Sequence, residues 1–345
     1  MSNKKLIEID AGNLFQNSTS KKTKTSTEIG FQFIGEKNIR LCNPDFPSMS
    51  ESSGSSTILD GILKVQYHED FKVPEYIEIN GNYYKVTDLG KCFVPRTMKT
   101  IFIPASISHI EELPLEVWCT PNLSKIQVSQ DNKYYDSRED CNAIIETASN
   151  TIITACNNTF IPESVKSIRA GAFCDVSLKS FFIGPNIIHI DYGFADFYGL
   201  ATLKVSKTNR FYDSRENCNA IIETATNTLV KGCITTKIPQ SVKRLGISSF
   251  STIEELESFS IPDNIEYVDG YAFCNCTGLK HIEIPASIKK IDARAFSYSG
   301  LKTVTIMNKK IKIHKTAFDP MVIINGHPVS YWMRSKGNYL DLNKE

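Results

Sequence analysis

The sequence predicts a repeat solenoid rich in β-strands, with parallel strands on one face, little helix and two inserted β-hairpins. Three observations support this fold class. A stretch of 22 residues that begins at Tyr135 recurs about 77 residues later at Tyr212, and roughly three-quarters of its positions are identical. Isoleucine followed by proline recurs every 22 or 23 residues in consecutive units, and alanine followed by phenylalanine keeps the same phase. Self-similarity of this kind is typical of units that stack on their neighbours.

Each unit is expected to contain one short strand and a returning arm. Within Leu279–Phe296, apolar and polar residues alternate over Ile282–Ile284, which indicates a strand with one buried face. Pro285 has no amide hydrogen to donate, so it ends that strand. The arm ends in the Ala-Phe pair, whose ring should stack on its counterparts to form an aromatic spine. Glycines such as Gly278 and Gly300 are expected to close each coil.

The strand frame recurs along the chain as a leucine with apolar residues three and five positions later. This is the spacing of a leucine-rich repeat. The pattern LxxIxIPxSIxxIxxxAF resembles the BspA-like leucine-rich repeats of bacterial surface antigens, and the resemblance extends from Ile58 or Leu59 to Phe318. It implies a non-catalytic module that binds a host or bacterial surface protein in adhesion, with a glycan as an alternative ligand. The further copies of the frame are Leu123–Val128, Leu178–Ile183, Leu200–Val205, Leu256–Ile261 and Leu301–Ile306.

The duplicated stretches are expected to form β-hairpins inserted between coils. In the first copy, the β-rich runs Ala143–Ile145 and Ile152–Ile153 flank small polar residues around Asn150, and the second copy repeats this pattern around Asn227.

The chain is expected to divide into four regions. Residues 1–56 are rich in serine, threonine and lysine and are interpreted as a flexible arm, apart from Phe31–Ile34. Residues 57–95, with the turn dipeptide Asn80-Gly81, form an N-terminal β cap. The solenoid occupies residues 96–318, with hairpins near 131–158 and 208–235. Residues 319–345 form a C-terminal cap in which Tyr331 and Trp332 cover the last coil.

Composition narrows the function classes. The formal net charge is +1, which gives no general attraction to nucleic acid. No stretch approaches the ~20 apolar residues that span a bilayer, so membrane insertion is not expected. The first residues carry acidic groups in place of an apolar core and do not form a secretory signal. A native start there predicts a cytoplasmic protein, for which an intracellular scaffold is the alternative function, whereas the family resemblance predicts the cell surface.

The sequence contains no motif that predicts catalysis, a cofactor or a metal site. The ten cysteines are interpreted mainly as reduced structural thiols, with a disulfide inside each hairpin, such as Cys141 with Cys156, as the alternative for an exported protein. The recurring Asp-Ser-Arg strings at Asp136 and Asp213 are interpreted as structural. A glycoside-acting enzyme is a distant alternative, for which the strand positions offer only Glu283 with Glu257.

The open strand face is the predicted binding surface, because solenoids present it as a continuous area. Two outward-facing aromatic residues, Phe102 and Phe182, are the leading contacts, since exposed rings often anchor interfaces. The alternative is that they pack against the hairpins. The remaining candidate partner-binding residues are Lys125, Gln127, Lys204, His281 and Glu283.

Overall fold

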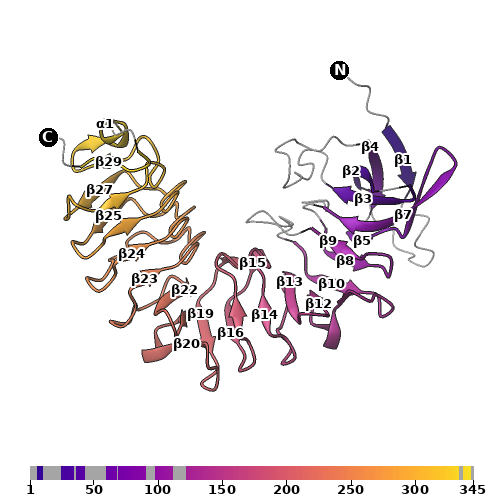
Figure 1. Cartoon of the computed structure of the whole chain (residues 1–345), viewed down its shortest axis with the longest axis horizontal. Coiled ribbons are helices and arrows are strands. Elements are labelled where there is room, and N and C mark those ends of the chain that lie inside the picture. Colours follow the sequence, from indigo (N-terminus) through magenta and orange to yellow (C-terminus); the bar gives the residue numbers. More distant parts are fainter. Residues whose placement is uncertain are drawn as a thin grey trace. The chain divides into compact units, whose positions relative to one another are not determined.

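The regular secondary structure of the described residues is almost entirely β-strand, as the repeat pattern predicts. The computed structural model describes residues 6–10, 25–34, 36–42, 60–67, 69–90, 98–111, 122–333 and 337–342 (Figure 1). The chain forms two compact units, Met1–Val176 and Ser177–Glu345. Among the described residues, the only α-helix is the single turn α1 (Val329–Trp332), beside the short 3₁₀ turns η2 (Arg138–Asp140) and η3 (Arg215–Asn217). A strand-rich solenoid with little helix is therefore confirmed.

The first unit begins with a mixed sheet of seven strands. Its order is β1-β4-β2-β3-β7-β6, and β9 pairs with β7. Residues 1–56 were expected to be mostly flexible apart from Phe31–Ile34, but three of these strands fall in that segment, so the expectation is wrong for the strand residues outside Phe31–Ile34. Apart from Glu36 and Lys37, the rest of the segment lies outside the described residues. The strands are β1 (Leu6–Asp10), β2 (Thr25–Ile34), β3 (Asn38–Cys42), β4 (Gly61–Tyr67), β6 (Tyr76–Ile79), β7 (Asn82–Leu89) and β9 (His109–Ile110).

The expected hairpin at Asn80-Gly81 joins β6 to β7. The φ angles are 53° at Asn80 and 77° at Gly81, and both are left-handed, as a type I′ turn requires. Ile79 and Val86 on these strands are buried in the apolar core of the unit.

A parallel strand face follows in the first unit. It consists of β5 (Asp70–Lys72), β8 (Thr100–Ile103) and β10 (Lys125–Val128), in the order β10-β8-β5. Phe71, Ile101 and Ile126 lie side by side in register and are buried. Their sequence neighbours face outward, so the predicted alternation is confirmed for this sheet.

The duplicated stretches form hairpins, as predicted, but they are not simple insertions. In each copy the second hairpin strand also pairs in parallel with a strand of the next coil. In the second unit this pairing continues through β22-β23-β24-β26-β28, so the hairpin begins a ladder that runs through the coils (Figure 1). The strands are β11 (Tyr135–Asp136), β12 (Ala143–Glu146), β13 (Thr151–Ala155), β14 (Ser167–Ile168), β20 (Tyr212–Asp213), β21 (Ala220–Glu223), β22 (Thr228–Gly232), β23 (Arg244–Leu245), β24 (Tyr267–Val268), β26 (Lys290–Ile291) and β28 (Lys312–Ile313).

The second unit carries two stretches of open strand face. One is the parallel pair β16 (Ser180–Ile183) and β19 (Thr202–Val205). The other contains β25 (His281–Ile284), β27 (Thr303–Ile306), β29 (Ile323–Ile324) and β30 (His327–Pro328). The remaining strands of the described residues are β15 (Phe173–Ser177), β17 (His189–Ile190) and β18 (Ala195–Tyr198).

The strand expected at Leu256–Ile261 does not form. Phe259, which occupies the third position after Leu256, faces inward as the frame predicts and packs edge-on against Phe250 and Phe273, with ring centroids 4.8 and 5.0 Å apart. The segment therefore keeps its inward contacts without the backbone pairing of a strand.

The predicted aromatic spine is present in the second unit. The rings of Phe250, Phe273, Phe296 and Phe318 stack in sequence, with centroids 5.3, 5.0 and 4.9 Å apart and planes within 10° of parallel. The first three rings are completely buried. One ring per coil thus links successive coils through the core.

The C-terminal end covers the last coil in the predicted way. Asn325 has a left-handed φ of 46°, and the turn with Gly326 joins β29 to β30. Trp332 is 4% exposed and donates from Nε1 to the Ile324 carbonyl. The predicted boundaries of the four regions stay a prediction.

Candidate functional site

Three of the predicted contact residues lie together on the strand face of the first unit. Phe102 on β8 is in register with Gln127 on β10 and with Lys72 on β5. Lys125 lies on the same face, one row away, in register with Thr100. The Lys72 ammonium lies 5.2 Å from the centre of the Phe102 ring, in a cation–π contact. Phe102 is half-buried, so part of its ring remains accessible.

Phe102 and Gln127 separate two hollows in this face. The smaller, of about 230 Å³, is lined by residues of β5 and β8, including Asp70 and Lys72. The larger, of about 630 Å³, extends from Phe102 to the loop that follows β11. Its far wall is formed by Asp136–Asp140, so an aromatic ring and a charged loop border the same space. The sequence pattern predicted the ring but not the hollow.

The other leading aromatic residue belongs to the second unit. Phe182 on β16 is in register with Lys204 on β19, as Phe102 is with Gln127 in the first. Phe182 is 55% exposed, whereas its strand neighbours Phe181 and Ile183 are buried. Its ring therefore belongs to the surface, as the alternation predicts.

His281 and Glu283 lie together on β25. The His281 Nδ1 is 2.8 Å from the Thr303 Oγ1 on the adjacent strand β27. Glu283 lines a hollow of about 360 Å³ with Asp263 and the exposed Met307. Glu257, the carboxylate that the sequence offered as a partner for Glu283, is not among the lining residues.

Replacing Phe182 with alanine is expected to change the free energy of unfolding by less than about 0.5 kcal/mol, because a half-exposed ring contributes little to the core. Chemical denaturation of the full chain measures this directly. A loss above about 2 kcal/mol would place the ring in the core and remove it from the candidate surface.

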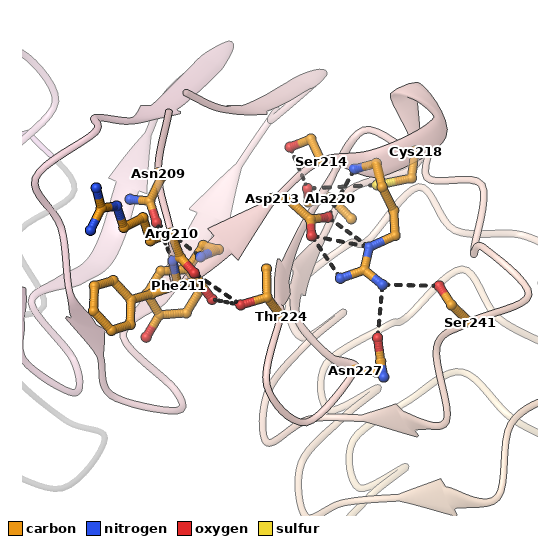
Figure 2. A network of polar contacts seen from close by, with 12 residues as sticks. Asn209, Arg210, Phe211, Asp213, Ser214, Cys218, Ala220, Thr224, Asn227 and Ser241 are labelled. Atoms are coloured by element: carbon orange, nitrogen blue, oxygen red, sulfur yellow. Dashed lines mark hydrogen bonds and ion pairs between the residues drawn. The ribbon is translucent and has the colours of Figure 1, made fainter. Parts of the chain in front are cut away.

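The recurring Asp-Ser-Arg strings form the same network in both hairpins. Arg215 donates from Nε and Nη2 to the Asp213 carboxylate, and from Nη1 to the Asn227 Oδ1 at 2.7 Å and the Ser241 Oγ at 3.2 Å (Figure 2). Arg138 makes the equivalent contacts with Asp136, Asn150 and Ser164. Each arginine therefore connects its own strand to the hairpin turn and to the next coil. This arrangement agrees with the structural interpretation of the strings.

Hydrogen bonding to Asp213 raises the pKa of Arg215, and the same cause acts on Arg138 beside Asp136. Both guanidinium groups therefore stay charged, with most of their donors directed at groups within the protein.

A second network of hydrogen bonds, from an asparagine side chain to the backbone, recurs in both units and was not predicted from the sequence. Asn209 donates from Nδ2 to the carbonyls of Gly184 and Ile187, and its Oδ1 accepts from the amides of Phe211 and Tyr212. Asn132 makes the corresponding four bonds in the first unit. Asparagine at this turn thus satisfies backbone groups of two successive coils.

The tyrosine that follows this turn accepts a hydrogen bond from a backbone amide of the preceding coil. The Tyr212 hydroxyl accepts from the Ile190 amide at 2.7 Å, and the Tyr135 hydroxyl accepts from the Ile110 amide at 2.9 Å. Burial raises the pKa of Tyr212 to about 12 and also raises the pKa of Tyr135.

Tyr212→Phe is expected to lower the free energy of unfolding by about 1–3 kcal/mol, because it leaves the buried Ile190 amide without an acceptor. Since the pKa of Tyr212 is higher in the folded state, its contribution is complete below about pH 10 and declines as the pH rises toward 12. The variant should lose less stability than the wild type over that interval. Phe211, exposed beside it, provides the control Phe211→Ala.

The eight described cysteines are free thiols. Burial raises the pKa of Cys141 to about 11 and also raises the pKa of Cys218 and Cys156. Cys141 and Cys156, the pair offered as a hairpin disulfide, each contact backbone carbonyls instead. These thiols pack as small apolar groups.

The second hairpin contains a buried lysine on its strand β22. Lys231 is 2% exposed and donates to the Ser248 carbonyl and, at 3.2 Å, to the Ser251 Oγ. Ser251 donates to the Asp196 carboxylate at 2.6 Å, and both Lys231 and Ser251 line a cavity of about 220 Å³. Lys231, Ser251 and Asp196 therefore form a polar network that joins successive coils.

Two further properties hold for the described part of the chain. It contains no group of three or more histidine, cysteine, aspartate or glutamate side chains arranged to hold a metal ion. It also contains no helix with the length and apolar character that crossing a bilayer requires.

Comparison with known proteins agrees with the repeat architecture. The family model for the BspA-type leucine-rich repeat region matches six copies, over residues 74–204, 144–233 and 217–325. No curated protein has a significantly similar sequence.

Solved structures that match the chain include three bacterial proteins. A leucine-rich repeat protein from Eubacterium ventriosum is 20% identical with a TM-score of 0.38; the alignment covers 67% of this chain and 64% of that protein. The pneumococcal vaccine antigen PcpA is 13% identical with a TM-score of 0.40, over 86% and 90% of the two chains. A leucine-rich cell-surface protein from Faecalibacterium prausnitzii is 16% identical with a TM-score of 0.39, over 91% and 98%.

Proposed function

Because the chain belongs to the family of BspA-type leucine-rich repeat proteins, we propose that it is a non-catalytic binding module that adheres to a protein through its open strand face. One observation carries the proposal. Each unit has an aromatic ring on the outward side of its open strand face, Phe102 in the first and Phe182 in the second. Neither ring belongs to the buried core.

Aromatic side chains are suited to this role. A ring buries a large apolar area while losing little conformational freedom, which makes aromatic residues frequent hot spots of protein interfaces. Phe102 also lies between two hollows that would receive partner side chains. The partner class that we propose, from the family, is a protein displayed on a host or bacterial surface.

The proposal is tested with fluorescent beads coated with the full chain and applied to epithelial monolayers and to bacterial cells. Saturable binding by the wild type is expected, and the double variant Phe102→Ala with Phe182→Ala should reduce it about tenfold or more. Tyr298→Ala is the matched control, because Tyr298 is 72% exposed and lies outside the strands of the open face.

Two outcomes would contradict the proposal. One is a double variant that binds as the wild type does. The other is a wild-type chain that binds neither surface, which would favour an intracellular scaffold.

A further inference from the structure

The residues that line the larger hollow of the first unit have counterparts in the second unit. Phe102 pairs in register with Gln127, and Phe182 pairs in the same way with Lys204, so the two aromatic rings are equivalent. Eleven residues line the first hollow, and seven are identical to their counterparts in the second copy. The identical residues include the Asp-Ser-Arg-Glu string that shapes the far wall.

The four lining positions that differ all change charge in the same direction. Each has one more negative charge, or one fewer positive charge, in the first copy. The pairs, first copy before second, are Gln127 and Lys204, Gln130 and Lys207, Asp131 and Thr208, and Asp140 and Asn217. The scaffold is thus the same while the formal charge of the lining positions differs by four.

The acidic charge of the first hollow is available to a ligand. Arg138 neutralises Asp136 through its bidentate contact, which leaves Asp131, Glu139 and Asp140 as the net charge of the wall. These three side chains form no ion pair with any described residue and are exposed. Three carboxylates therefore face the same space as an accessible aromatic ring.

The local backbone of the hairpin does not require these carboxylates. Asp140 and its counterpart Asn217 share the same left-handed backbone, with φ of 53° and 52°, and both hairpins retain the same arginine network. Both sets of residues therefore occur on the same local backbone. The four differences change the charge that the surface presents to a partner.

We propose that the strand face around Phe102 docks a basic segment of the protein partner, in which an apolar side chain contacts the ring and neighbouring arginine or lysine side chains pair with Asp131, Glu139 and Asp140. This rests on the proposed function and specifies the chemistry of its partner. The equivalent surface around Phe182, where Lys204 and Lys207 replace the glutamines, does not accept such a segment.

The test uses two fluorescein-labelled decapeptides, one alternating arginine with leucine and the other alternating glutamate with leucine. The chain has a formal net charge of +1, so a preference for the arginine peptide reports a local surface. Anisotropy titration of the full chain at about 50 mM salt is expected to show binding of the arginine peptide, which weakens as salt is added.

The internal copy supplies the variants. The converted variant Gln127→Lys, Gln130→Lys, Asp131→Thr and Asp140→Asn gives the first hollow the residues of the second, and about a tenfold loss of affinity for the arginine peptide is expected. The reverse variant Lys204→Gln, Lys207→Gln, Thr208→Asp and Asn217→Asp should gain affinity. All eight new residues already occur at the equivalent positions, so both variants are expected to fold.

Equal affinity of the wild type and the converted variant for the arginine peptide would overturn the inference, as would the absence of binding to the wild type or a preference for the glutamate peptide. The bead assay distinguishes a failure of this inference from a failure of the proposed function. Adhesion that depends on Phe102 and Phe182 but not on the four charges leaves the proposed function intact and removes only the basic partner.

Discussion

Replacing Phe273 with alanine is expected to lower the free energy of unfolding of the second unit by about 3–5 kcal/mol. The ring is completely buried between Phe250 and Phe296, with centroids 5.3 and 5.0 Å away, and Phe259 contacts its edge. Its removal opens a cavity and interrupts the stack between successive coils. Denaturation followed by circular dichroism measures the change.

The control for this prediction is Phe182→Ala, which deletes the same ring from an exposed position. Similar stability changes for the two variants would show that the spine does not hold the coils together. Because coils of a solenoid interact mainly with their neighbours, hydrogen exchange should also place the loss around Phe250–Phe296.

Gly300→Ala is expected to destabilise the second unit by about 3 kcal/mol. A Cβ at this position would overlap the carbonyl oxygen of Thr277 in the preceding coil, and the Thr277 carbonyl carbon would be only 2.8 Å away. The Gly300 amide also donates to the Cys276 carbonyl at 3.0 Å, which keeps the two backbones close. The side chain therefore has no space unless the coils separate.

Gly184→Ala is the matched control, because nothing lies within 4 Å of a Cβ at that position. Thermal denaturation of both variants gives the comparison. A Gly300→Ala variant as stable as Gly184→Ala would mean that the coils are not in close backbone contact at this closing turn.

Features that repeat in phase could be predicted from the sequence. The spine follows from the Ala-Phe pairs and the hairpins from the β-rich runs around Asn150 and Asn227, both of which have left-handed φ angles of 54°. The outward positions follow from the period of two along each strand. These are local patterns, so a single sequence reveals them.

Long-range pairing could not be predicted in the same way. β2 pairs with both β3 and β4, and although its residues alternate as a strand does, they do not specify these partners. The Asn209 and Tyr212 bonds reach backbone groups about 22 to 25 residues away, so their role depends on how coils stack. These hydrogen-bond partners are therefore set by the stacking of the coils and cannot be identified from the sequence alone.

The candidate site was predicted only in part for the same reason. Phe102 could be identified from the strand frame, but the hollow beside it needs the loop in which Glu139 and Asp140 both have left-handed φ angles. Such angles are uncommon for these residues. The acidic wall that this loop presents could be recognised only once it was placed opposite the ring.

Site-specific photo-crosslinking tests the central claim, binding through the open strand face, most directly. Benzoylphenylalanine is placed at position 102, 182 or 298 of the full chain, and each protein is irradiated on the surface of intact epithelial or bacterial cells. The account predicts saturable crosslinks to a cell-surface protein from positions 102 or 182 and none from position 298. Crosslinking from position 298 alone, or equally from all three positions, would contradict it.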